Sequence, residues 1–176
     1  MLYLCVATTG YAQLFLNPSK TPDQYNYQHW SSDDRLPDNA VINLLQSRDG
    51  YIWFASYGGV TRFNGIEFYS YSSNTHPEIV NNSFTYVFED LNGAIWAATS
   101  GNGIVSIKNE KVVAYSEEQG LSSNFAESFA QGSDSVLYVA TSEGLVYKKD
   151  SIFTNDGLPP VLKDSHLICL TTDDKG

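Results

Sequence analysis

The stretch that decides the fold is "DGYIWFASYGGVTRFNG" at Asp49–Gly65, because it returns as "NGAIWAATSGNGIVSIKNE" at Asn92–Glu110. Both copies contain a turn glycine, an aliphatic residue, a tryptophan, a run of small residues and a second glycine turn. Trp53 and Trp96 are 43 residues apart. Agreement at several positions with one spacing indicates a repeated structural unit.

The same period extends along the rest of the chain. A third copy, "DSVLYVATSEGLVYKKD" at Asp134–Asp150, has Tyr138 at the tryptophan position, 42 residues after Trp96. An asparagine recurs in register upstream of the three copies, at Asn39, Asn82 and Asn124. A period of about 40–45 residues made of short strands is typical of a β-propeller blade.

The local sequence favours strands. "YIWFAS" and "LYVATS" are short, rich in aromatic and β-branched residues, and bounded by turn residues. Hairpin turns are expected at Asn64-Gly65, Asn92-Gly93 and Asn109-Glu110. No window shows a sustained helical period of apolar residues. The sequence therefore predicts an all-β fold with about four strands in each repeat and the tryptophans packed between blades.

Three repeats span 36–78, 79–120 and 121–157, and residues 158–176 begin a fourth. These repeats amount to roughly 3.5 blades of about 42 residues. Closed propellers have about four to eight blades. We therefore expect the chain to be a fragment of a larger ring.

The N-terminal stretch differs from the repeats. Residues 1–12 carry no charge, and the small residues Gly10 and Ala12 precede an expected cleavage before Gln13. This pattern predicts a clipped signal peptide, although the usual positive region is missing and a simple apolar leader is the alternative. Residues 13–35 form a polar lead-in, in which "YNYQHW" is a candidate outer strand that completes a blade.

Composition excludes some partners. The chain of 176 residues has 20 acidic and 10 basic residues, a net charge of −10, and no basic stripe. An acidic chain of this kind repels phosphate backbones, so we expect no direct nucleic-acid binding. Hydrophobic residues make up 42%, which indicates a globular chain.

The stretch Leu36–Tyr71 resembles the two-component regulator propeller repeat. The matching residues of the first copy are Leu36, Asn39, Asp49, Gly50, Trp53, Ser56, Gly59 and Phe63. Those of the second copy are Asn82, Gly93, Trp96, Thr99 and Gly103, and those of the third are Leu121, Asn124, Thr141 and Gly144. Ser135 and Tyr138 depart from the glycine and tryptophan of the pattern. The resemblance covers 36–176.

The resemblance implies a function that composition does not. Such propellers form the extracytoplasmic sensor of hybrid histidine kinases, and their ligands are commonly carbohydrate fragments. It implies a periplasmic segment of a homodimeric parent anchored in the inner membrane, with a kinase core downstream in the same chain. No kinase motif occurs within these 176 residues, so we expect no catalysis from this segment.

Asn39, Asn82 and Asn124 are the candidate ligand-binding residues, because they lie in loops expected at one mouth of the central channel. Amide side chains bind sugar hydroxyls well, but the alternative is that they satisfy turn backbone groups. His29, His76 and His166 are isolated and lack metal-ligand spacing. The sequence predicts no metal, cofactor or catalytic residue.

Two other function classes stay open. One is a secreted or periplasmic propeller that binds or scaffolds without a kinase. The other is a propeller enzyme such as a lyase or quinone-dependent dehydrogenase. An enzyme would need clustered histidine, arginine or acidic residues at one channel mouth, and the sequence offers no such cluster.

Overall fold

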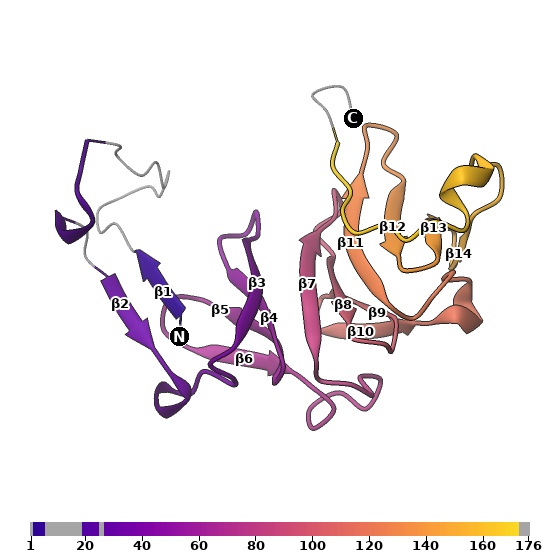
Figure 1. The fold of residues 1–176 in the computed structure, drawn as a ribbon. Coiled ribbons are helices and arrows are strands. Elements are labelled where there is room, and N and C mark those ends of the chain that lie inside the picture. Colours follow the sequence, from indigo (N-terminus) through magenta and orange to yellow (C-terminus); the bar gives the residue numbers. More distant parts are fainter. Residues whose placement is uncertain (1, 6–18, 25–26, 173–176) are drawn as a thin grey trace.

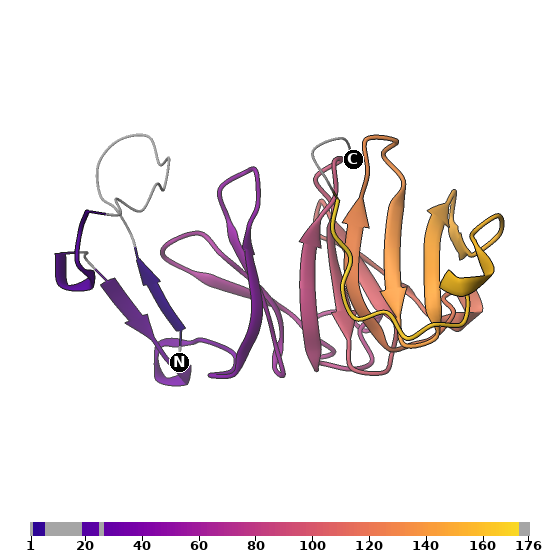
Figure 2. The ribbon, with the colours of Figure 1, turned by 45° about the horizontal axis from the view of Figure 1, so that its top comes forward.

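The computed structural model describes residues 2–5, 19–24 and 27–172, and it contains three four-stranded antiparallel sheets side by side (Figures 1 and 2). Blade 1 consists of β3 (Val41–Gln46), β4 (Ile52–Ser56), β5 (Gly59–Phe63) and β6 (Phe68–Tyr71). Blade 2 consists of β7 (Phe84–Glu89), β8 (Ile95–Thr99), β9 (Ile104–Lys108) and β10 (Lys111–Tyr115). Blade 3 consists of β11 (Ala126–Gln131), β12 (Leu137–Thr141), β13 (Gly144–Lys149) and β14 (Ile152–Thr154).

Within each blade the strands pair in chain order, so every connection is a hairpin. The prediction of an all-β chain with four-stranded repeats is confirmed, and each sheet lies inside one of the expected repeats. The turns lie where the sequence predicted them. Between β9 and β10, Asn109 and Glu110 both have positive φ, 49° and 64°. A two-residue turn with this backbone twist matches the twist of the flanking strands.

The first strands of the blades, β3, β7 and β11, lie beside one another and form the inner edge of the row of blades (Figure 1). In each of these strands the pairing register shifts between the first and the third residue, which marks a bulge at the second residue. A side-chain hydrogen bond, rather than a ladder, joins β3 to β7, and a similar bond joins β11 to the segment that follows blade 3. Asn43 Oδ1 accepts from the Val87 amide at 3.1 Å, and Ser128 Oγ accepts from the Leu170 amide at 2.8 Å.

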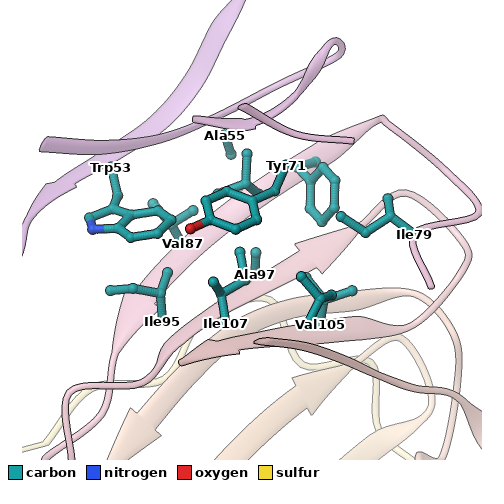
Figure 3. Close-up of a cluster of buried hydrophobic side chains, with 12 residues drawn as sticks. Trp53, Ala55, Tyr71, Ile79, Val87, Ile95, Ala97, Val105 and Ile107 are labelled. Carbon is teal, nitrogen blue, oxygen red and sulfur yellow. The ribbon is translucent and has the colours of Figure 1, made fainter. Parts of the chain in front are cut away.

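The hydrophobic core lies between the blades. Trp53 and Tyr71 of blade 1 pack in one buried cluster with Ile95 and Ile107 of blade 2 (Figure 3). Trp96 of blade 2 continues the pattern by packing against residues of blade 3. The tryptophans therefore lie between neighbouring blades, as the repeat predicted, because one blade cannot bury both of its faces alone.

A two-stranded sheet lies beside blade 1 (Figure 1). It pairs β1 (Leu2–Cys5) with β2 (Tyr27–Trp30), and β2 lies within the candidate strand "YNYQHW". Among the described residues β2 pairs with β1 and not with a strand of a blade, so its role in completing a blade stays a prediction. The Trp30 ring meets Phe63 of blade 1 edge-on, with 4.9 Å between ring centroids. Of the expected leader 1–12, only the β1 residues belong to the described part of the chain, and the expected cleavage site lies outside it.

Residues 158–172 follow blade 3 without forming a strand among the described residues. The segment makes a short 3-10 turn, η4 (Pro160–Leu162), and then runs alongside β11 (Figure 1). Its contact with Ser128 repeats the joint between β3 and β7. The described residues include no helix that is long and apolar enough to cross a membrane.

Candidate functional site

The loops that lead into the inner strands contain a recurring turn. Before β3, Ser31 caps the 3-10 helix η2 (Ser32–Asp34), and before β11, Ser116 caps η3 (Glu117–Gln119). In both, a side-chain oxygen of the third helix residue accepts a hydrogen bond from the serine amide. This reciprocal capping box satisfies backbone donors that would otherwise have no partner. The sequence thus specifies the same loop geometry on the same side of two blades.

The three repeated asparagines hold these loops together through their amide oxygens. Each Oδ1 accepts a hydrogen bond from a backbone amide at the start of the turn. The donor is Ser32 for Asn39, at 2.8 Å, Ser73 for Asn82, at 2.8 Å, and Glu117 for Asn124, at 3.0 Å. Within the described residues, Nδ2 of Asn82 and of Asn124 donates no hydrogen bond. The structure therefore gives the oxygen of each asparagine a role in the turn, and ligand binding by the amide stays a prediction.

The loops that contain the asparagines contact the second hairpin turns of the blades. Asn81 Nδ2 donates to the Ser100 carbonyl at 2.9 Å and to Asn102 Oδ1 at 3.1 Å. In the next blade, Ser123 and Ser142 share a hydrogen bond of 2.8 Å between their hydroxyls. We call the face made by these loops and turns the mouth face. It surrounds the start of the inner strands.

Two exposed aromatic side chains on the mouth face were not singled out by the sequence. Tyr57, in the turn between β4 and β5, and Phe125, just before β11, are each 55% exposed. A signal for Tyr57 exists, because the equivalent positions of the other repeats are Ser100 and Ser142. Phe125 directly follows Asn124, whose amide nitrogen donates to no described residue, so this stretch offers a flat apolar surface together with a hydrogen-bond donor. That combination suits a sugar ring.

The histidines do not gather into a site. His76 Nδ1 lies 2.9 Å from Thr75 Oγ1, its ring packs against Tyr71, and His166 lies 3.7 Å from Glu127. His29 lies on β2, beside blade 1. The part of the chain that the structure describes has no group of three His, Cys, Asp or Glu side chains placed to hold a metal ion.

One stretch of the chain matches a known family. Residues 35–58 match the family described as two component regulator propeller. This segment runs from the end of the η2 turn through β3 and β4, and it contains Asn39 and Trp53. No curated protein matches the chain at a significant level.

Solved structures show the same fold. The extracellular domain of the hybrid two component system BT4673 from B. thetaiotaomicron matches with a TM-score of 0.66, 21% identity and 80% of this chain covered. The extracellular domain of the hybrid two component system BT3049 from the same organism matches with a TM-score of 0.64, 24% identity and 76% of this chain covered. The chain spans only 21% and 20% of the lengths of these two domains.

Virginiamycin B lyase from Staphylococcus aureus, solved with quinupristin, also matches, with a TM-score of 0.58, 20% identity, and 74% of this chain and 45% of the lyase covered. At these identities the likeness concerns the fold alone, and it is shared by sensor domains and an enzyme. The similarity to a repeat family comes from the sequence match of residues 35–58. The chain therefore has the fold of successive β-propeller blades, and one stretch of it matches the two component regulator propeller family.

Proposed function

We propose that the chain is the N-terminal part of an extracytoplasmic β-propeller sensor domain of a two-component regulatory protein. It binds a carbohydrate fragment and passes the signal to a histidine kinase downstream in the same polypeptide. The observation that carries this proposal is the family match at residues 35–58. The extracellular domains of hybrid two component systems that share the fold support the same compartment.

The mouth face is the proposed ligand site. Its supporting features are the amide donors of Asn82 and Asn124, which no described residue uses, and the exposed rings of Tyr57 and Phe125. Asn39 occupies the equivalent place in the first loop. The loops of the mouth face come from different blades, so a ligand that bridges them can bias how the blades are held.

The parent protein, in this proposal, is a homodimer anchored in the inner membrane, and residues 1–12 are its clipped signal peptide. The alternative is a secreted or periplasmic propeller that binds or scaffolds without a kinase. Reading the coding sequence beyond Gly176 separates the two. An apolar helix followed by a kinase core is expected, whereas a sorting tail or stop codon after the propeller would favour the scaffold.

Ligand binding is tested by calorimetric titration of the chain with a panel of oligosaccharides. The informative variant is Asn82→Asp, which keeps the oxygen that accepts from Ser73 but removes the amide donor. Its matched control is Asn64→Asp in a hairpin turn on the opposite face, where the oxygen alone is used. We expect about tenfold weaker binding for Asn82→Asp and no change for the control. Equal affinities for both variants and the parent chain would remove the mouth face as the site.

A further inference from the structure

A cavity lies between blades 1 and 2, on the face opposite to the mouth face. It has a volume of about 440 Å³ and is formed by turns and strands of both blades. Trp53 and Tyr71 line it, and both are buried, at 4% and 0% exposure. Within the described residues, neither Trp53 Nε1 nor the Tyr71 hydroxyl has a hydrogen-bond partner. We call this cavity the interblade cleft.

Buried polar groups without partners are uncommon, and leaving one unsatisfied costs about 1–3 kcal/mol. Figure 3 shows the indole nitrogen of Trp53 and the hydroxyl of Tyr71 directed toward the same side of the cluster, above Ile95 and Ile107. Two such groups at one cavity are a stronger indication of an absent partner than either alone. The partner must include a hydrogen-bond acceptor, because an indole N–H can only donate.

The other repeats supply this acceptor from the chain itself. Trp96 Nε1 donates to Asp90 Oδ2 at 2.9 Å, and in blade 3 the Tyr138 hydroxyl lies 3.4 Å from Asp134 Oδ2. In blade 1 the residue equivalent to Asp90 is Ser47. The Ser47 hydroxyl donates within its own turn, to Asp49 and to the Tyr51 carbonyl, and it does not accept from Trp53 Nε1, which has no partner among the described residues.

Arg62 adds further donors at the same place. It lies opposite Trp53 in the pairing of β4 with β5, where blade 2 has Ser106 opposite Trp96. Its guanidinium carbon is 4.8 Å from the Tyr51 ring centroid and 5.9 Å from that of Trp53. These cation–π contacts hold the group over the cleft.

The charged partner of Arg62 is weakly engaged. Its ion pair with Glu110 is long, at 3.8 Å, and the Glu110 side chain is 71% exposed. Among the described residues the Arg62 guanidinium makes no hydrogen bond. The N–H groups of Arg62 are therefore available to a ligand, and Glu110 is available as an acceptor beside them.

The charge of the lining selects the class of ligand. Arg62 and Lys108 contribute positive charge, whereas Asp49, Glu89 and Glu110 contribute negative charge. Arg48 neutralises Glu89 through an ion pair of 3.3 Å. With Arg48 included, the three positive and three negative side chains balance, and the lining contains both hydrogen-bond donors and acceptors. A hydroxyl group both donates and accepts, so it fits this lining better than a carboxylate or an ammonium group does.

We propose that the interblade cleft binds one neutral sugar unit or similar polyol, with a hydroxyl oxygen accepting from Trp53 Nε1 and Tyr71, and with Arg62 and Glu110 binding neighbouring hydroxyls. The volume lies within the range of about 300–1,000 Å³ that ligand pockets occupy. This site is separate from the mouth face and stands whether or not the mouth face binds.

The test follows the indole resonances of the full chain by ¹⁵N nuclear magnetic resonance. The chain has three tryptophans, so three indole signals are assigned by substitution. The probes are glucose, galactose, mannose, xylose and fucose at millimolar concentration, with glucuronate and glucosamine as charged counterparts. We expect at least one neutral sugar to shift the Trp53 signal while the Trp96 signal, whose N–H is already bonded to Asp90, stays in place.

Ser47→Asp is the decisive variant, because it gives Trp53 the acceptor that Trp96 has. We expect about tenfold weaker sugar binding with the fold retained. Tyr71→Phe removes one ligand contact without creating a buried unsatisfied group, and it should weaken binding by a similar factor. Asn64→Asp, outside the cleft, is the control that leaves the affinity unchanged.

Three results would overturn the proposal. In the first, no neutral sugar shifts the Trp53 signal, which leaves an ordered water as the only partner of the indole N–H. In the others, only a charged probe binds, or Ser47→Asp binds the sugar as tightly as the parent chain does. If no neutral sugar shifts the Trp53 signal while an oligosaccharide binds with loss in Asn82→Asp, the cleft proposal fails and the proposed function of the mouth face stands.

Discussion

The indole nitrogen of Trp96 donates a hydrogen bond of 2.9 Å to Asp90 Oδ2, and both side chains are buried. The other carboxylate oxygen, Oδ1, accepts from the Asn92 and Ala94 amides at 2.8 Å and 2.9 Å. Asp90 therefore ties the turn between β7 and β8 to the core between blades 2 and 3.

Replacing Asp90 with alanine should lower the free energy of unfolding by about 2–4 kcal/mol, because it leaves buried donors unsatisfied. Urea unfolding measures the change. Asp134→Ala is the matched control, since Asp134 is exposed and its contact with Tyr138 is long, and we expect a loss below about 1 kcal/mol. Similar losses for the two variants would contradict the role given to the buried carboxylate.

Gly103, in the turn between β8 and β9, should not tolerate a side chain. It has a φ of 77°, and an added Cβ would lie 2.1 Å from the Tyr115 carbonyl oxygen. Gly103→Ala combines backbone strain with a clash against another strand, so we expect a loss of about 3 kcal/mol or more, measured by thermal unfolding.

A variant at Gly50 separates the effect of backbone strain from the effect of the steric clash. Its φ is 90°, but an added Cβ would have no atom within 4 Å. Gly50→Ala should therefore cost only the strain of a left-handed backbone, about 1–2 kcal/mol. Equal losses at the two positions would show that the contact with Tyr115 is not limiting.

The asparagine of the inter-blade loop should contribute to stability independently of any ligand. Asn82→Ala removes the acceptor for the Ser73 amide, and we expect a loss of about 1 kcal/mol in the free energy of unfolding. Asn82→Asp keeps that acceptor and should unfold at nearly the same urea concentration as the parent chain. A full loss in the aspartate variant would mean that the amide nitrogen, rather than the oxygen, holds the turn.

Tyr71 should make the fold sensitive to alkaline pH. Burial raises the pKa of the Tyr71 hydroxyl, and the charge of Arg62 partly opposes this shift. The unfolded chain therefore loses this proton at lower pH than the folded chain. The contribution to stability is complete below about pH 10, the ordinary tyrosine value, and is lost as the pH rises further.

Tyr71→Phe should show a weaker decline in the free energy of unfolding above that pH, measured by urea unfolding across a pH series. Tyr57→Phe, which removes an exposed hydroxyl, is the control and should decline like the parent chain. Identical slopes for Tyr71→Phe and the parent chain would assign the alkaline transition to other groups.

The repeat made most of the fold predictable. The 43-residue spacing between Trp53 and Trp96 required a unit that recurs, and the Asn-Gly turns separated its strands. The position of the tryptophans between blades followed, because a repeated large apolar residue needs a neighbouring copy to cover it.

The candidate sites were less predictable, because they depend on which loops and turns meet in space. Sequence reasoning found Asn39, Asn82 and Asn124 but could not show that their oxygens are used by the turns. Alignment of the repeats shows that Ser47 occupies the position of Asp90 in the second repeat. Its meaning, a buried indole N–H without an acceptor, needs the packing of Tyr71 and blade 2 around Trp53.

The hydrogen bonds that the Val87 and Leu170 amides donate to the side chains of Asn43 and Ser128 have a consequence for how such a ring can evolve. Each joint uses a side chain of one copy and the backbone amide of the next, at corresponding positions of the repeat. The corresponding residue of β7 is Tyr86, whose side chain accepts no such bond among the described residues, so the contact is not needed at every boundary. A duplicated copy that has a hydrogen-bonding side chain at this position can make the same contact with the copy that follows it. Gene duplication can therefore enlarge the ring by whole blades that reuse this contact.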